Sequence, residues 1–143
     1  METYKMNEAK LFVDGGIRKG IMALGFVVYS MQDEELFSGK KTCGRRGTSN
    51  ISEYRALIAG LQSCLDNKVE TIHIYSDSLI MVKQITEAMK VNNPILIKHK
   101  NKCLELLNKF KDFTIKWIPR NENKRADKLV NEVFDAKNGK RNK

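Results

Sequence analysis

The segment Lys10-Leu11-Phe12-Val13-Asp14-Gly15-Gly16 is an apolar run that ends in an acid and two glycines. Such a run predicts a β-strand. A second one, Ile72-His73-Ile74-Tyr75-Ser76-Asp77, also ends in aspartate and is followed by a helix-like stretch. Ligands bind at the carboxyl ends of strands in α/β sheets, because the loops there are free of packing duty. We therefore expect Asp14 and Asp77 to lie at a binding edge of one sheet.

The pattern along the rest of the chain predicts a mixed sheet. Three strand-like segments, residues 10–16, 23–31 and 35–43, follow one another too closely for parallel crossovers, so they are expected to be antiparallel. Apolar residues at helical spacing then alternate with two further strand-like runs. The predicted order is β-β-β-α-β-α-α-β-α, with helices at 52–67, 79–89, 95–110 and 124–135 and strands at 71–76 and 113–118. This order is that of an α/β domain.

Composition limits the class of protein. A chain of 143 residues fits one domain, and its net charge of +9 suits a polyanionic partner, although solvated lysines would give the same excess. We expect residues 1–9 to be a loose lead-in, 10–136 the domain, and 137–143 a basic tail. The longest apolar run, residues 21–29, is too short for a membrane span. Three cysteines without a Cys-x-x-Cys spacing favour a reducing, cytoplasmic location.

Four acids are candidate metal ligands, and each has a structural alternative. Asp14 before two glycines fits a turn, Asp77 fits a helix N-cap, and Glu53 and Asp127 fit first helical turns, where the macrodipole favours acids. Taken together, the four converge on one sheet edge, where their repulsion requires cations. Hard divalent metals prefer such oxygens, and two ions about 3.5–4 Å apart support phosphoryl displacement.

These residues occur in segments that resemble type 1 ribonuclease H, whose members cut the RNA strand of RNA–DNA hybrids. The resemblance extends from about residue 10 to 135. Its segments are Phe12-Val13-Asp14-Gly15-Gly16, Thr48-Ser49-Asn50-Ile51-Ser52-Glu53-Tyr54-Arg55-Ala56-Leu57, Ile74-Tyr75-Ser76-Asp77-Ser78 and Trp117-Ile118-Pro119-Arg120-Asn121-Glu122-Asn123-Lys124-Arg125-Ala126-Asp127. The resemblance implies a ribonuclease H-like fold, with a five-stranded mixed sheet and helices on both faces.

The resemblance also implies roles for the acids. Asp14 would bridge two Mg²⁺ or Mn²⁺ ions, Glu53 and Asp77 would complete the ion on the leaving-group side, and Asp127 the ion that holds the attacking water. The products would carry 5′-phosphate and 3′-hydroxyl ends. The substrate-binding residues would be Gly15, Gly16, Arg18, Thr48, Ser49, Asn50 and Arg120. The expected partner is an RNA–DNA hybrid, with no membrane and no obligate protein partner.

Three departures from the family pattern keep an alternative open. Many members have a histidine in the loop before the last acid, where this chain has Arg120, which stays protonated and is no general base. The two histidines lie elsewhere, and His73 is expected to be packed in the core, as is Trp117. The turn after the first strand lacks the usual Asn-Pro-Gly. The basic handle between central helices is missing, so substrate must be held elsewhere, and the basic tail is a candidate. The alternative is a catalytically weak or inactive nucleic-acid-binding module of the same fold. An integrase or transposase is disfavoured, because their last acid is usually glutamate.

Overall fold

The computed structural model describes residues 7–141 of the chain, and side chains up to residue 136. The order of its elements is the predicted one, with a short 3₁₀ helix added before the last helix. The elements are β1 (Glu8–Arg18), β2 (Ile21–Tyr29), β3 (Glu35–Arg45), α1 (Ser49–Asp66), β4 (Thr71–Ser76), α2 (Leu79–Ile85), α3 (Pro94–Leu107), β5 (Asp112–Trp117), η1 (Arg120–Glu122) and α4 (Lys124–Arg141).

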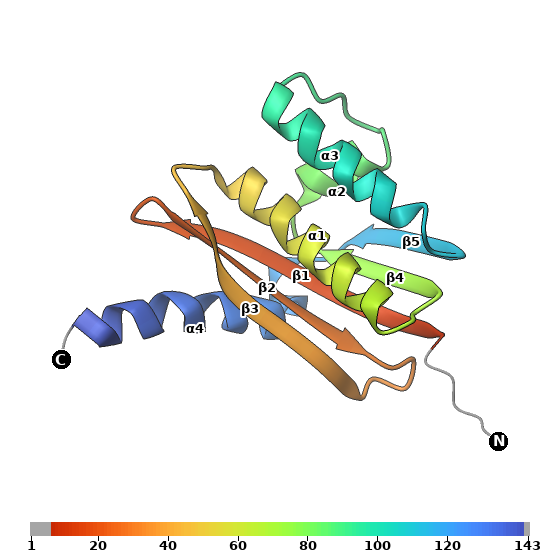
Figure 1. The fold of residues 1–143 in the computed structure, drawn as a ribbon, viewed down its shortest axis with the longest axis horizontal. Helices are drawn as coiled ribbons and strands as arrows, with labels where there is room; N and C mark the ends of the chain where they lie inside the picture. The colour runs from red at the N-terminus through yellow and green to blue at the C-terminus, as the bar shows by residue number, and fades with distance from the viewer. Residues whose placement is uncertain (1–6, 142–143) are drawn as a thin grey trace.

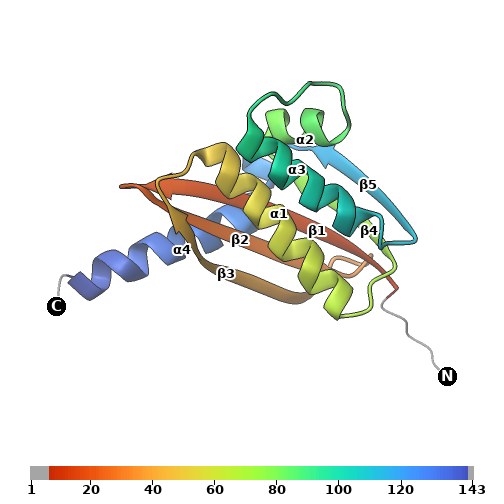
Figure 2. The same ribbon diagram turned by 45° about the horizontal axis from the view of Figure 1, so that its top comes forward.

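The five strands form one mixed sheet in the order β3-β2-β1-β4-β5. β1 pairs antiparallel with β2, and β2 with β3, while β1, β4 and β5 run parallel. Helices α1 and α3 lie on one face and α4 on the other (Figures 1 and 2). The larger apolar core lies between α1 and the sheet, and a smaller one lies under α4. The prediction of a mixed sheet with helices on both faces is confirmed.

β1 is longer than predicted at both ends. It continues past Gly16 to Arg18, because Lys19 (φ 53°) and Gly20 (φ 77°) form a tight left-handed turn into β2. It begins at Glu8 and buries Ala9 completely, so these two residues belong to the sheet and not to the predicted lead-in. The first six residues of that lead-in lie outside the described part of the chain.

The helices differ from prediction mainly at their ends. α1 begins at Ser49 instead of residue 52, because Thr48 caps it by accepting a hydrogen bond from the Ile51 N–H (3.2 Å). α2 stops at Ile85, two residues before Glu87 turns left-handed (φ 67°). α4 continues to Arg141, so the predicted tail is helical up to that residue. Residues 142–143 of the tail lie outside the described chain.

Two residues expected in the core are not there. Trp117 is 46% exposed, because β5 is an edge strand, and its indole N–H donates to the Asp77 carbonyl (3.1 Å). Ile72 and Ile74 take the buried positions of β4, which leaves His73 on the opposite face. There its ring is only partly buried and lies between Glu8 (2.7 Å) and Thr114 (2.9 Å).

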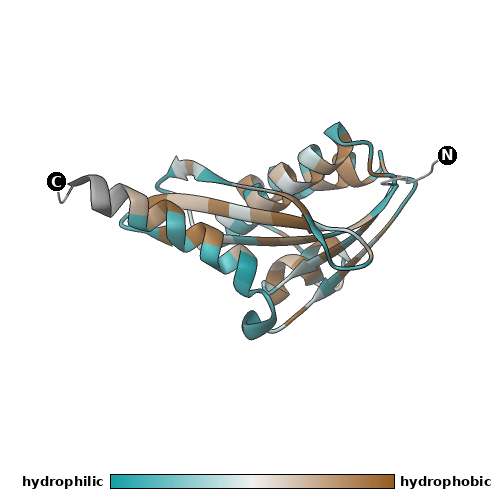
Figure 3. Cartoon of the chain, turned by 90° about the horizontal axis from the view of Figure 1, so that it is seen from below, coloured by the Kyte–Doolittle hydropathy of each residue, from teal (hydrophilic) through white to brown (hydrophobic). Residues whose placement is uncertain are grey.

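Hydropathy follows this layered arrangement. Figure 3 shows apolar residues concentrated along the strands, and polar residues recurring along α4. Within the described residues, no helix combines the length and apolar character needed to cross a membrane.

Candidate functional site

The pairing of β1 with β4 brings the first two acids together. Val13 is level with Ser76 in the parallel register, and β4 ends at Ser76 while β1 continues. The next residues, Asp14 and Asp77, therefore lie beside each other where the sheet opens. Ser78, and not Asp77, caps α2 by accepting from the Met81 N–H (3.2 Å). Asp14 lies within a strand, so the turn and cap alternatives do not describe these two acids.

Gly15 brings the third acid to the same place. Its N–H lies beyond the end of β4 and donates to the Glu53 carboxylate (2.9 Å). A Cβ atom at this position would lie 2.4 Å from the backbone carbonyl carbon of Ser52. Only glycine allows the first turns of α1 to approach β1 this closely. The close approach of helix and strand thus places Glu53 beside Asp14.

Three carboxylates form a group with metal-ligand spacing. Asp14, Glu53 and Asp77 each offer an oxygen, and these oxygens all lie within 4.8 Å of one another. Asp127, in the first turn of α4, lies outside this group but lines the same cavity. We call it the acid cavity. It has a volume of about 420 Å³ and is lined by Asp14, Gly15, Gly16, Ile17, Arg18, Ser49, Glu53, Asp77, Arg120, Asp127, Val130, Asn131 and Phe134.

The electrostatics of the acid cavity favour a bound cation. Burial, and then the charges of Asp77 and Asp127, raise the pKa of Asp14 to about 8. Burial and the charges of Asp14 and Asp77 raise the pKa of Glu53 to about 9, although the hydrogen bond from Gly15 opposes the rise. Burial also raises the pKa of Asp77. Carboxylates that resist ionisation because they lie close together and partly out of water are stabilised by a divalent metal ion. The residues present therefore fit such an ion.

The predicted substrate-binding residues surround the acid cavity in different ways. Arg18 extends along α4, with its guanidinium 4.6 Å from the Phe134 ring centroid and 3.7 Å from the Asp135 carboxylate. Thr48 caps α1. Ser49 lines the acid cavity, but neither Thr48 nor Asn50 does. A Cβ at Gly16 would lie 3.2 Å from Val130, so both glycines also serve close packing.

Arg120 and Asn131 hold the fourth acid from either side. Arg120 is highly exposed, with its side chain at 80%, and its guanidinium lies 3.4 Å from the Asp127 carboxylate. The Asn131 amide, one turn after Asp127, donates to the other carboxylate oxygen (3.4 Å). The prediction did not include Asn131, although its i,i+4 spacing from Asp127 was available.

Asn123 is a second residue of the site that the sequence did not predict. It is 1% exposed, and its amide donates to the Val13 carbonyl (2.8 Å), immediately before Asp14. The same amide lowers the pKa of Asp77, opposing the effect of burial. Among the described residues, nothing forms a hydrogen bond with its buried Oδ1 atom. The only sequence signal was an asparagine directly before a helix start, which is typical of an N-cap.

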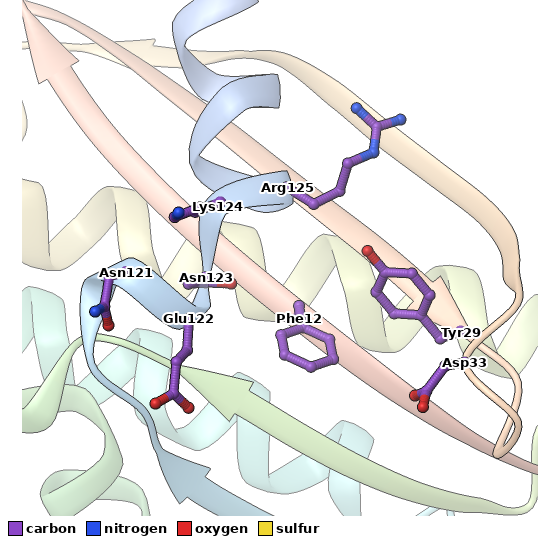
Figure 4. Close-up of a pocket in the computed structure, with 8 residues that line it drawn as sticks. All are labelled: Phe12, Tyr29, Asp33, Asn121, Glu122, Asn123, Lys124 and Arg125. Carbon is purple, nitrogen blue, oxygen red and sulfur yellow. The ribbon is translucent and has the colours of Figure 1, made fainter.

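A separate cavity of about 330 Å³ lies beside the same loop (Figure 4). Two of its lining residues are aromatic and meet edge-on, Phe12 and Tyr29 (5.4 Å between centroids), and Phe12 also stacks on Tyr75 outside the cavity (4.7 Å). Its charges are mixed, with Asp33 and Glu122 opposite Lys124 and Arg125. None of its lining residues lines the acid cavity.

The strand order of the sheet, with the acids gathered where β1 passes the carboxyl end of β4, is that of the ribonuclease H-like class of folds. Residues 12–133 match the sequence model of the family described as reverse transcriptase-like. The chain belongs to the type 1 ribonuclease H family, which confirms the resemblance drawn from its segments.

Named relatives support this assignment. Ribonuclease HI of Halobacterium salinarum is 38% identical over 126 residues, which are 87% of this chain and 63% of that protein. The crystal structure of RNase H1 from the same archaeon has a TM-score of 0.87 at 36% identity, and the match covers 90% of this chain and 98% of that chain. LC11-RNase H1, crystallised in complex with RNA/DNA hybrid, has a TM-score of 0.83 at 27% identity, and the match covers 90% of this chain and 97% of that chain. The chain spans less than two thirds of the length of the curated relatives it matches.

Proposed function

We propose that this chain is a metal-dependent endoribonuclease that hydrolyses the RNA strand of RNA–DNA hybrids. The observation that carries the proposal is the group of carboxylate oxygens from Asp14, Glu53 and Asp77 within 4.8 Å of one another, in an open cavity. Support comes from a relative named Ribonuclease HI and from a similar structure crystallised with RNA/DNA hybrid.

In this proposal the acids bind two Mg²⁺ or Mn²⁺ ions. Asp14 would hold both ions, Glu53 and Asp77 would hold the one on the leaving-group side, and Asp127 would hold the other. When bound, two such ions activate water and stabilise the leaving oxygen of an in-line displacement, which leaves 5′-phosphate and 3′-hydroxyl ends. The chain's own contribution is to hold the carboxylates in place. The Gly15 N–H donates to Glu53, and the Asn131 amide donates to Asp127, with the Arg120 guanidinium beside it.

Substrate binding is assigned to residues around the acid cavity. Thr48, Ser49 and Asn50 at the start of α1 contact the hybrid, whose 2′-hydroxyls and groove shape distinguish it from DNA. Gly15 and Gly16 line the cavity beside the acids, and Arg18 supplies charge. Arg120 binds a phosphate, since a permanently charged guanidinium cannot accept a proton. The basic residues of 137–143 add further attraction to a polyanion.

We also propose that the protein acts in the cytoplasm, with which its free cysteines are consistent.

A cleavage assay tests this proposal. Labelled hybrid, duplex DNA and duplex RNA are incubated with the protein and either Mg²⁺ or Mn²⁺. We expect cleavage of the hybrid alone, and loss of that cleavage in Asp14→Asn. Asp66→Asn, which changes an exposed acid at the end of α1, is the matched control and should cut like the parent. An Asp14→Asn protein as active as the parent would refute the proposal.

A second candidate is a nucleic-acid-binding module of the same fold with weak or no cleavage. It is favoured by Arg120, which pairs with Asp127 in the loop where many relatives have histidine. Intact hybrid after long incubation with Mn²⁺, together with salt-sensitive binding of that hybrid, would support it over the enzyme.

A further inference from the structure

Two shallow cavities lie side by side on α1 and share Arg55 and Ile58. One, of about 530 Å³, reaches α3 and is lined by Arg55, Ile58, Pro94, Ile95, Lys98, His99 and Lys102. The other, of about 430 Å³, reaches β3 and adds Leu24, Lys41, Thr42, Cys43, Ala59 and Gln62. We call the two together the α1–α3 groove. It shares no residue with the acid cavity.

The charge of the α1–α3 groove has one sign. Lys41, Arg55, Lys98 and Lys102 line it, and no aspartate or glutamate of the described residues does. Lys102 has Glu105 at 3.7 Å, on the same helix. Within the described part of the chain, Lys41, Arg55 and Lys98 form no salt bridge. Three cations of the groove thus lack an acidic partner within the described chain.

Arg55 is held at the centre of the α1–α3 groove. Its guanidinium donates to the Cys43 carbonyl on β3 and, over 3.2 Å, to Nε2 of His99 on α3. The other ring nitrogen, Nδ1 of His99, lies 2.8 Å from the Ile95 carbonyl. A carbonyl only accepts, so Nδ1 carries the proton and Nε2 is free to accept from Arg55. This chain of contacts joins three elements and fixes the cation in place before any ligand arrives.

Apolar side chains line the groove together with the cations. Ile58, Pro94 and Ile95 line it, and Ile95 is 54% exposed on the first turn of α3. A phosphodiester backbone would pair with the cations and leave these side chains in water. A peptide with both carboxylates and apolar side chains would cover both. A second copy of this chain, at net charge +9, would be repelled.

We propose that the α1–α3 groove binds an acidic peptide segment with apolar anchor residues, supplied by a partner protein. The proposal is independent of hybrid cleavage, because the α1–α3 groove and the acid cavity are separate. It assigns the exposed Ile95 to an anchor contact and Arg55, Lys41 and Lys98 to the carboxylates.

The probe is a fluorescent twelve-residue peptide in which aspartate and glutamate alternate with leucine and phenylalanine. Its binding is followed by anisotropy and by amide chemical shifts of the ¹⁵N-labelled full chain. We expect saturable binding, shifts at residues of α1 and α3 that line the groove, and about tenfold weaker binding by Ile95→Ser/Lys98→Glu. Lys111→Glu, an exposed lysine outside the groove, is the charge control and should bind within about twofold of the parent.

Three results would overturn the proposal. They are no saturation at millimolar peptide, an equal loss in Lys111→Glu, and shifts at the groove amides caused by single-stranded DNA or hybrid at lower concentration than by peptide. The last result would make the groove a nucleic-acid surface. Circular dichroism of each variant establishes that a loss of binding is not a loss of fold.

Discussion

The acid cavity and the α1–α3 groove collect charge under opposite conditions. In the cavity, carboxylates from β1, α1 and the end of β4 lie so close together, and so far out of water, that the pKa values of Asp14 and Glu53 rise to about 8 and 9. In the groove, lysines are exposed and spread over β3 and α3. Crowded buried charges carry a cost that only a specific ligand offsets, whereas exposed charges cost little and attract many partners. This difference is the one expected between a site that binds metal ions and a surface that binds a partner.

The largest expected effect is on cleavage. Asp77→Asn keeps the size of the side chain and removes a metal-binding oxygen charge, so the rate of hybrid cleavage should fall by about a thousandfold or more. Lys98→Glu reverses a charge in the α1–α3 groove and should change the rate by no more than about threefold. Steady-state kinetics of both variants on one hybrid measures the contrast. Similar losses in the two variants would contradict the separation of the sites.

The next effect concerns Asn123, which ties the loop before α4 to β1. Asn123→Ala leaves the Val13 carbonyl buried without its donor, which should cost about 1–3 kcal/mol of unfolding free energy. The affinity for Mn²⁺ should fall as well, because Val13 directly precedes Asp14. Urea denaturation and titration calorimetry measure the two quantities.

Asn121→Ala is the control for Asn123. It changes an exposed asparagine of the same loop, and its free energy of unfolding should stay within about 0.5 kcal/mol of the parent's. If both variants were equally stable and bound Mn²⁺ equally well, Asn123 would have no positioning role.

The positions that could be predicted are those with a local signal. Alternation of apolar residues identified β4 with its observed bounds, and the apolar stripes identified the four helices. Asp77 at the end of β4 followed directly from that pattern. The type of each element depends on near neighbours in the sequence, and periodicity therefore reveals it.

The positions that could not be predicted depend on distant contacts. Trp117 alternates like a core residue but lies on an edge strand, and the sheet order that makes it an edge is set by long-range pairing. Asn123 reaches Val13 across 110 positions, and its place before a helix start does not reveal that contact. Asp14 lies in mid-strand because the Lys19-Gly20 turn extends β1, and the parallel register with β4 places it beside Asp77.

Metal-free protein should become less stable as pH rises. The folded pKa values of Asp14 and Glu53, about 8 and 9, lie above their unfolded values near 4. The folded state therefore holds protons that the unfolded state has lost, and stability falls between about pH 4 and pH 9. Asp14→Asn has no such proton to lose. In EDTA the free energy of unfolding of this variant should match the parent's near pH 4.5 and exceed it by about 1–3 kcal/mol at pH 9.

Urea denaturation of the parent and Asp14→Asn across this pH range measures the difference. Added Mg²⁺ should restore the parent at pH 9, because it binds the ionised carboxylates, and should do less for the variant. A difference between the two proteins that is constant with pH would mean that Asp14 ionises normally in the folded state.

The smallest effect is expected at Arg120, which lies at the border between the two kinds of charge. It is exposed like the groove lysines, yet its guanidinium lies 3.4 Å from Asp127 in the acid cavity. Such an exposed pair adds little stability, so the free energy of unfolding of Arg120→Gln should lie within about 1 kcal/mol of the parent's. If Arg120 binds a substrate phosphate, KM for the hybrid should rise about three- to tenfold, and the slope of log KM against log salt concentration should become shallower by about one. Arg120→Lys keeps the charge and should recover most of the salt slope but less of the affinity, since lysine lacks the planar fork. A lower kcat with unchanged KM and salt slope would instead place Arg120 in the chemical step, acting through Asp127.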